Sequence, residues 1–197
     1  MIGGPGTLTS VTDASGEDGF GGYAFVAGDP NTVYLVSVEW PKHIRAALAT
    51  AALPRGERVR GIPALSMPAA ELFTASVVPL VVSEHVWFDA VYAVGDCQPA
   101  VGVVNSVGST NPQMNLLVQM GRRASRSWLG VHVRRELNLD PDRLSHPCLL
   151  PDVVADAREA GLRVVVVPIP AAHPAWKDLD AAAALGCGTV DSPTWPD

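Results

Sequence analysis

Residues 7–40 read TLTSVTDASGEDGFGGYAFVAGDPNTVYLVSVEW, and this stretch decides the fold. Its β-branched and aromatic segments predict three strands, at residues 7–13, 23–27 and 32–40. Glycines at positions 16, 19, 21 and 22 predict the first turn, and GDPN at 28–31 predicts the second. Three strands joined by such turns indicate an antiparallel meander, and its first strand ends on Asp13.

The chain after the meander alternates between helix and strand patterns. We predict helices at 67–84, 99–108, 111–127 and from 140 onward, and strands at 89–96 and 128–136. Pro79 should kink or end the first of these helices. A meander followed by alternating elements predicts an α/β fold. We expect a mixed five-stranded sheet, with three antiparallel strands and then two further strands, flanked by helices.

Two parts of the chain extend beyond this pattern. Residues 1–148 are expected to form the main domain, with an insertion at about 41–66 that carries a short helix. Residues 149–197 are expected to form a C-terminal extension that packs a helix (151–161) and a strand (162–170) on the core. A short Ala-rich helix follows, and the last ten residues, GTVDSPTWPD, are expected to be frayed.

Composition limits the class of protein. The chain has 197 residues, 48% of them hydrophobic and 17% charged, which suits one folded domain with an appendage. Three widely spaced cysteines without a CxxC motif argue against a zinc site or a disulfide framework and favour a reducing compartment. No signal peptide or membrane-spanning run is visible, so we expect an intracellular protein, cytoplasmic or nuclear, or a piece of a larger polypeptide.

Four carboxylates carry the chemistry. Asp13 and Asp96 each end a predicted strand, Glu71 lies near the start of a helix, and Asp142 opens another helix. Polar groups at strand ends gather at one edge of an open sheet, and carboxylates gathered there repel one another unless cations lie among them. Oxygen ligands of this kind suit Mg²⁺ or Mn²⁺. Taken singly, each residue also fits a structural role as a turn former, a helix N-terminal acid or a solvated side chain.

Four segments, in this order, resemble the ribonuclease H family, and most closely the ribonuclease H domains of retroelements. They are TDASGEDGFGGYAF (12–25), PAAEL (68–72), VGDCQPAVGVVN (94–105) and HVRRELNLDPDRLSHP (132–147). The resemblance covers about residues 8–147. Within the last segment, the spacing from Asn138 to Asp142 is the most specific element.

The resemblance implies a ribonuclease H-like fold and an endonuclease that cleaves the RNA strand of RNA–DNA hybrids. It makes Asp13, Glu71, Asp96 and Asp142 the catalytic carboxylates that bind two Mg²⁺ or Mn²⁺ ions. It further implies an in-line attack by water activated by the ions, and an adjoining reverse transcriptase domain as a partner.

Some residues depart from the family pattern. Arg134 stands where the family usually has Pro, and Asp140 lies two residues before Asp142 and competes with it as the last ligand. Many members carry a mobile His shortly before the last Asp. His132 lies ten residues before Asp142 but inside a predicted strand, so His132 and Asp140 are auxiliary candidates.

The net charge of −6 argues against a generally cationic surface for nucleic acid. A local strip of arginines could still bind phosphates; it comprises Arg122, Arg123, Arg126, Arg134, Arg135 and Arg143. Asn105 and Ser106, in the connection after the Asp96 helix, are candidates for contacts to a minor groove or to 2′-hydroxyls. The alternatives are a solvated helix end for the arginines and ordinary turn formation for the small polar residues.

Two rival functions remain open. The chain could be a non-catalytic ribonuclease H-like module that binds or scaffolds, although the four carboxylates argue against that. It could also be a nuclease of the same superfamily that acts on DNA. Trp40, Trp87 and Trp128 are expected to be core or strand-edge anchors rather than base-stacking platforms.

Overall fold

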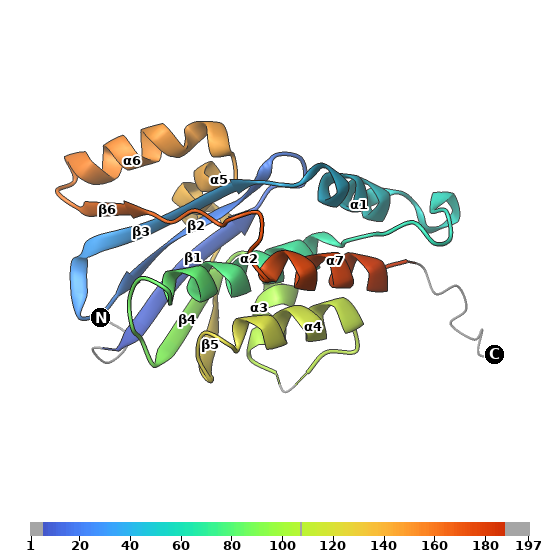
Figure 1. The fold of residues 1–197 in the computed structure, drawn as a ribbon, viewed down its shortest axis with the longest axis horizontal. Helices are drawn as coiled ribbons and strands as arrows, with labels where there is room; N and C mark the ends of the chain where they lie inside the picture. Colours follow the sequence, from blue (N-terminus) through green and yellow to red (C-terminus); the bar gives the residue numbers. More distant parts are fainter. Residues whose placement is uncertain (1–5, 107, 188–197) are drawn as a thin grey trace.

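The computed structural model describes residues 6–106 and 108–187, and its centre is one mixed sheet (Figure 1). The strands are β1 (Thr7–Ala14), β2 (Gly19–Val26), β3 (Asp29–Glu39), β4 (Ala90–Gly95), β5 (Ser127–His132) and β6 (Arg163–Val166). Their order across the sheet is β5-β4-β1-β2-β3-β6. The expected frayed segment at 188–197 lies outside the described residues.

The strand directions confirm the α/β fold with a mixed sheet that begins as a meander. β1 pairs antiparallel with β2 and β2 antiparallel with β3, whereas β4 and β5 add parallel to β1 on the other side. The prediction of five strands was wrong, because the sheet has six. The strand expected in the C-terminal extension, β6, adds parallel to the free edge of β3 and so joins the main sheet.

Helices cover both faces of the sheet, as Figure 1 shows. The helices are α1 (Lys42–Ala52), α2 (Met67–Val82), α3 (Gln98–Val104), α4 (Pro112–Gly121), α5 (Leu139–Leu144), α6 (Leu150–Glu159) and α7 (Ala175–Leu185). Helix α2 packs on β1, β2 and β4, and α3, α4 and α7 extend that layer. Helices α5 and α6 lie on the opposite face.

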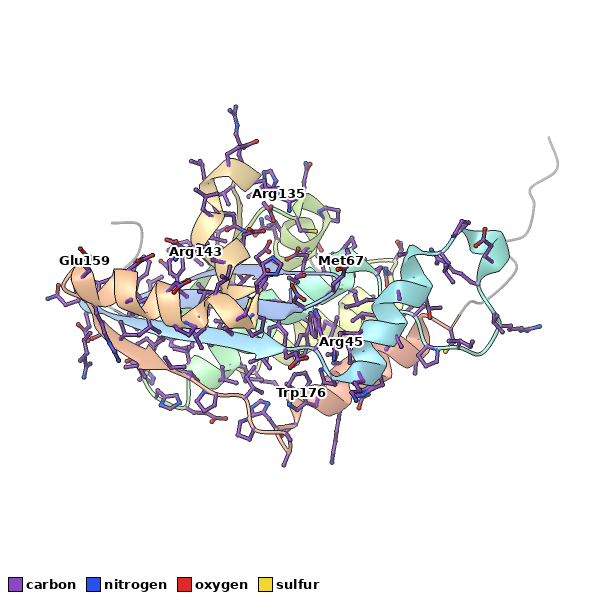
Figure 2. All side chains as sticks on the ribbon, turned by 90° about the horizontal axis from the view of Figure 1, so that it is seen from above. Arg45, Met67, Arg135, Arg143, Glu159 and Trp176 are labelled. Carbon is purple, nitrogen blue, oxygen red and sulfur yellow. The ribbon has the colours of Figure 1, made fainter. Side chains whose placement is uncertain are left out.

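Helix α2 is the centre of the larger layer, because it is apolar on nearly all sides. Phe73 of α2 packs edge-on against Phe20 of β2, with ring centroids 5.4 Å apart. Trp40 and Trp176, the latter labelled in Figure 2, complete this aromatic cluster. The helix does not end at Pro79 but continues to Val82. A helix that is apolar on nearly all faces, as α2 is, is typically enclosed by neighbouring elements on every side.

The glycines after Asp13 are mostly strand residues. We predicted that they build a turn, but three of them, Gly19, Gly21 and Gly22, lie in β2. A Cβ atom at Gly21 would lie 2.2 Å from the carbonyl oxygen of Leu144, at the end of α5. The Ser37 hydroxyl donates to that same oxygen at 2.6 Å. Glycine is therefore needed here because α5 rests directly on the backbone of the sheet.

Residues 41–66 and the C-terminal helix α7 meet at one buried side chain. The Gln113 amide on α4 donates to the carbonyl oxygens of Ala64 (2.7 Å) and Ala182 (2.8 Å). Leu179 of α7 is fully buried. These contacts bind three distant parts of the chain to the core. Among the described residues, no helix combines the length and the apolar character needed to cross a membrane.

Some element ends differ from the predictions. Strand β5 stops at His132, because a short 3-10 turn (Arg135–Leu137) follows instead of more strand. Helix α4 stops at Gly121, which leaves residues 122–126 in a loop. Trp40 is 1% exposed, as expected of a core anchor, whereas Trp87 is 75% exposed and so is not part of the core.

Candidate metal centre

Three carboxylates meet at one edge of the sheet. Asp13 is near the end of β1, and Asp96 directly follows β4. Because β1 and β4 are parallel neighbours, their carboxyl ends lie side by side. Glu71 reaches the same edge from the N-terminal part of α2. One carboxylate oxygen from each of Asp13, Glu71 and Asp96 lies within 4.8 Å of the other two.

Burial makes this cluster unfavourable as three free anions. Asp13 is only 7% exposed, and burial, followed by the charges of Asp96 and Asp142, raises its pKa from 3.8 to about 6. Burial is also the largest cause that raises the pKa of Glu71 to about 9, with the charges of Asp13 and Asp96 adding to it. A cation among these oxygens would remove the repulsion.

The donor set fits a hard divalent cation. All three groups are carboxylates, the ligand type that Mg²⁺ and Mn²⁺ prefer over thiol or imidazole. The separation of at most 4.8 Å between ligand oxygens allows one ion to touch all three. The structure therefore supports divalent-metal binding at Asp13, Glu71 and Asp96.

The backbone and α5 hold two of these carboxylates in place. The backbone N–H of Ala14 donates to Glu71. The Asn138 amide, which is 1% exposed, donates to the carbonyl oxygen of Thr12 (3.3 Å) and to the Asp13 carboxylate (3.5 Å). The Ser145 hydroxyl donates to the carbonyl oxygen of Asp142 (2.8 Å) and lies near enough to Asp13 to offset part of the rise in its pKa. Within the described residues, the Asn138 amide oxygen is buried without a hydrogen-bond partner.

Asp142 borders the same site, whereas Asp140 does not. A cavity of about 360 Å³ is lined by Asp13, Glu71, Asp96 and Asp142. Asp140, two residues earlier on α5, lines a different and largely apolar cavity between the sheet and α6. There Arg143, labelled in Figure 2, binds Asp140 at 3.4 Å and Asp156 of α6 at 2.8 Å. Of the two rival aspartates, only Asp142 faces the carboxylates.

His132 lies at the end of β5, on the Asp96 side of the cluster. Its ring Nε2 is 3.0 Å from the carbonyl oxygen of Asp96, so the ring N–H donates to that oxygen. The ring is exposed, and the strand register places it beside Gly95, the residue before Asp96. The structure thus brings this auxiliary candidate next to the backbone that carries Asp96.

The predicted arginine strip divides into separate groups. Arg122, Arg123 and Arg126 precede β5, and the register pairs Ser127 with the start of β4. They line a cavity of about 450 Å³ together with Trp128, at the end of the strands away from the carboxylates. The five residue steps from Ser127 to His132 span roughly 17 Å at the usual strand rise.

Arg134 and Arg135 follow β5 instead and therefore lie at the carboxylate edge. The Arg135 guanidinium is 3.9 Å from the Asp142 carboxylate and lines the carboxylate cavity. Figure 2 shows Arg135 beside α5. Two of the arginines thus remain next to the candidate site, while Arg143 connects α5 to α6.

The small polar candidates are occupied by internal hydrogen bonds. The Asn105 side chain donates to the carbonyl oxygen of Gly130 (2.9 Å) and accepts from its N–H (2.7 Å), which fastens α3 to β5. The Ser106 hydroxyl donates within its own turn, to Val103 or Gly108. Both side chains stabilise the loop after α3 in this arrangement.

Sequence reasoning missed several residues at this site. Asn138 entered only through its spacing to Asp142, and Ser145 and His146 were assigned no role. Asp18, in the turn before β2, was assigned no role either. The available signal was position: Ser145 and His146 follow Asp142 within about one helical turn, so they were candidates for the same edge.

Comparisons with known proteins give a distant likeness. No family model matches the chain, and no curated protein matches it. Among solved structures, the chain is similar to RNase H1 from the halophilic archaeon Halobacterium salinarum NRC-1. The two are 13% identical with a TM-score of 0.44, and the match covers 76% of this chain and 97% of the archaeal one.

Proposed function

We propose that this protein is a metal-dependent endonuclease of the ribonuclease H family that cleaves the RNA strand of RNA–DNA hybrids. The observation that carries the proposal is the meeting of Asp13, Glu71 and Asp96 at the edge where β1 and β4 end. The resemblance in sequence names these same residues as ligands. The order of the first five strands, with the meander on one side and two parallel strands on the other, agrees with that assignment.

In this mechanism Asp13, Glu71 and Asp96 would hold the cations, and Asp142 would complete the site from α5. Two bound Mg²⁺ or Mn²⁺ ions would supply the Lewis acidity that activates water and stabilises the leaving oxygen of a phosphodiester. The Asn138 amide, which donates to the Asp13 carboxylate at 3.5 Å, helps to orient it. Arg135 lines this cavity with a largely exposed side chain, and we propose that a nucleic-acid backbone approaches past it.

Four labelled substrates test which nucleic acid is cleaved: an RNA–DNA hybrid, duplex RNA, duplex DNA and single-stranded RNA. We expect cleavage of the RNA strand of the hybrid in Mg²⁺ or Mn²⁺ and none in EDTA. Asp96→Asn should lower the rate of hybrid cleavage at least about 100-fold. A metal contributes several kcal/mol of transition-state stabilisation, and each 1.4 kcal/mol or so corresponds to a factor of about ten in rate.

The rival functions give different results in the same assay. A binding or scaffolding module would bind the hybrid but leave it intact with both metals. A nuclease that acts on DNA would cleave the DNA duplex in preference to the hybrid. The retroelement origin and an adjoining reverse transcriptase domain are further parts of the proposal. They rest on the sequence resemblance, above all on HVRRELNLDPDRLSHP (132–147).

A further inference from the structure

A histidine with a carboxylate partner borders the carboxylate cavity. His146 follows α5 and lines the same cavity as Asp13, Glu71 and Asp142. Of the residues that line this cavity, Arg135 and His146 are the two that can carry positive charge. The Arg135 side chain is 82% exposed, whereas that of His146 is 34% exposed. His146 is thus the more enclosed cationic group at the rim.

Asp18 fixes the orientation of the His146 ring. The Nδ1 atom of His146 lies 2.5 Å from the Asp18 carboxylate, and because a carboxylate accepts, Nδ1 carries the proton. Asp18 itself is held in the turn between β1 and β2, where its carbonyl oxygen accepts from the Trp40 N–H at 3.0 Å. Nε2 has no hydrogen-bond partner in the part of the chain that the structure describes.

The Asp18–His146 pairing leaves Nε2 of His146 as the nitrogen that can contact a ligand. In the imidazolium form of the ring, Nε2 carries a proton and donates a hydrogen bond. His132, on the other side of the cluster, differs because its Nε2 already donates to the carbonyl oxygen of Asp96. A donor with positive charge beside a metal centre is suited to an anionic oxygen of the substrate.

We propose that the Asp18–His146 pair binds a phosphate of the nucleic-acid backbone next to the phosphodiester at the metal centre. The proposal rests on the proposed function, because it assumes that a nucleic-acid strand crosses the carboxylate cavity. A polyanion that approaches four carboxylates needs a positive group at the rim. His146 supplies it on the β1–β2 side, and Arg135 supplies it on the β5 side.

The competing explanation is that the pair only fastens α5 to the β1–β2 turn. Binding of a fluorescent RNA–DNA hybrid distinguishes the two, measured by anisotropy with Ca²⁺ in place of Mg²⁺, over a range of salt concentrations. His146→Ala should weaken binding about tenfold, the usual worth of one charge-assisted hydrogen bond. It should also reduce the slope of log affinity against log salt by about 0.7–0.9, the value for one phosphate contact.

Asp18→Asn and Glu17→Gln form a matched pair of variants. Both remove one negative charge from the same turn, and Glu17 is exposed. If only the overall charge mattered, both variants would bind the hybrid more tightly. Positioning of His146 by Asp18 predicts instead that Asp18→Asn binds the hybrid about two- to fivefold more weakly, as expected when a charged hydrogen-bond acceptor becomes neutral. Glu17→Gln should bind no more weakly than the wild type.

Thermal unfolding and His146→Lys complete the test. His146→Lys keeps the cation and should restore most of the affinity and the salt slope, even if its melting temperature is lowered. Unchanged affinity and slope in His146→Ala would overturn the proposal, as would loss of affinity that follows stability and is not rescued by Lys. Since binding is measured without cleavage, a wild type that binds the hybrid but never cleaves it refutes the proposed enzyme and not this contact.

Discussion

The Asp13 carboxylate should destabilise the protein when no metal is bound. Burial and the neighbouring carboxylates raise its pKa in the folded state from 3.8 to about 6. A carboxyl group with a raised folded pKa contributes stability that is fully present below the unfolded pKa and is lost as the pH rises through the folded pKa. Stability should therefore fall between about pH 4 and pH 6 and remain low at pH 8.

The magnitude follows from the size of this shift. A difference of about two pKa units corresponds to about 3 kcal/mol at pH 8, where the carboxyl is ionised in both states. Asp13→Asn removes the charge and keeps an oxygen that can accept from Asn138. We expect this variant in EDTA at pH 8 to unfold about 6–12 °C higher than the wild type, at about 2–4 °C per kcal/mol for a chain of this size.

Calorimetry at two pH values, with and without metal, measures this effect. The gain should be far smaller at pH 4, where the wild-type carboxyl is largely protonated in the folded state. Glu17→Gln, an exposed carboxylate in the adjacent turn, is the control and should show no such gain. Adding Mg²⁺ at ten times its Kd should stabilise the wild type by roughly 1.4 kcal/mol and Asp13→Asn by much less.

Two results would refute this reasoning. The first is a metal-free Asp13→Asn variant that is less stable than the wild type at pH 8. The second is a gain of equal size at pH 4 and pH 8, since the effect would then not come from ionisation.

Further predictions concern the contacts that position the site. Gly21→Ala should lower the free energy of unfolding by about 2 kcal/mol or more, because the added Cβ overpacks against the α5 backbone. Gly102→Ala, whose added Cβ meets open space on α3, should raise it by up to about 1 kcal/mol. Thermal melts of both variants check this. Gln113→Ala should cost about 1–3 kcal/mol in urea unfolding, because two buried carbonyl oxygens lose their donor. Asp142→Asn should slow hybrid cleavage at least about tenfold, whereas Asp140→Asn, in a separate cavity, should leave the rate within a factor of two of the wild type; equal losses would contradict the placement of the two side chains.

Local patterns were enough to predict the main sheet. Alternating apolar residues and turn signals placed β1 and β4 within one residue of their observed bounds and β3 within three. Because Asp13 and Asp96 each end a predicted strand, we predicted that they share an edge of the sheet. The parallel pairing of β1 with β4 places them there. This part of the fold could be predicted because the alternation of apolar and polar residues is visible in a single sequence.

Contacts between distant segments could not be predicted in this way. The glycines of β2 look like a turn until α5 is placed on them, because the close approach at Gly21 involves Leu144, more than a hundred residues later. The arginines from 122 to 135 are close in sequence, but β5 lies between them and carries them to opposite ends of the sheet. The sixth strand likewise depended on a free edge at β3.

The residues that hold the site in place could not be predicted for the same reason. Neither Asn138 nor the Asp18–His146 pair is visible as a motif, because each joins the first hairpin to a segment beyond residue 137. Only the docking of α5 brings these groups to Asp13. Choosing between Asp140 and Asp142 also required the helix, since side chains two residues apart on a helix point in different directions.

The central claim is that Asp13, Glu71 and Asp96 form a divalent-metal centre. Anomalous scattering from crystals grown with Mn²⁺ tests it most directly, because the signal locates the metal independently of the protein atoms. We expect Mn²⁺ between these three carboxylates, with a second ion on the Asp142 side when a hybrid is bound. Crystals saturated with Mn²⁺ that show no anomalous peak at this cluster would contradict it.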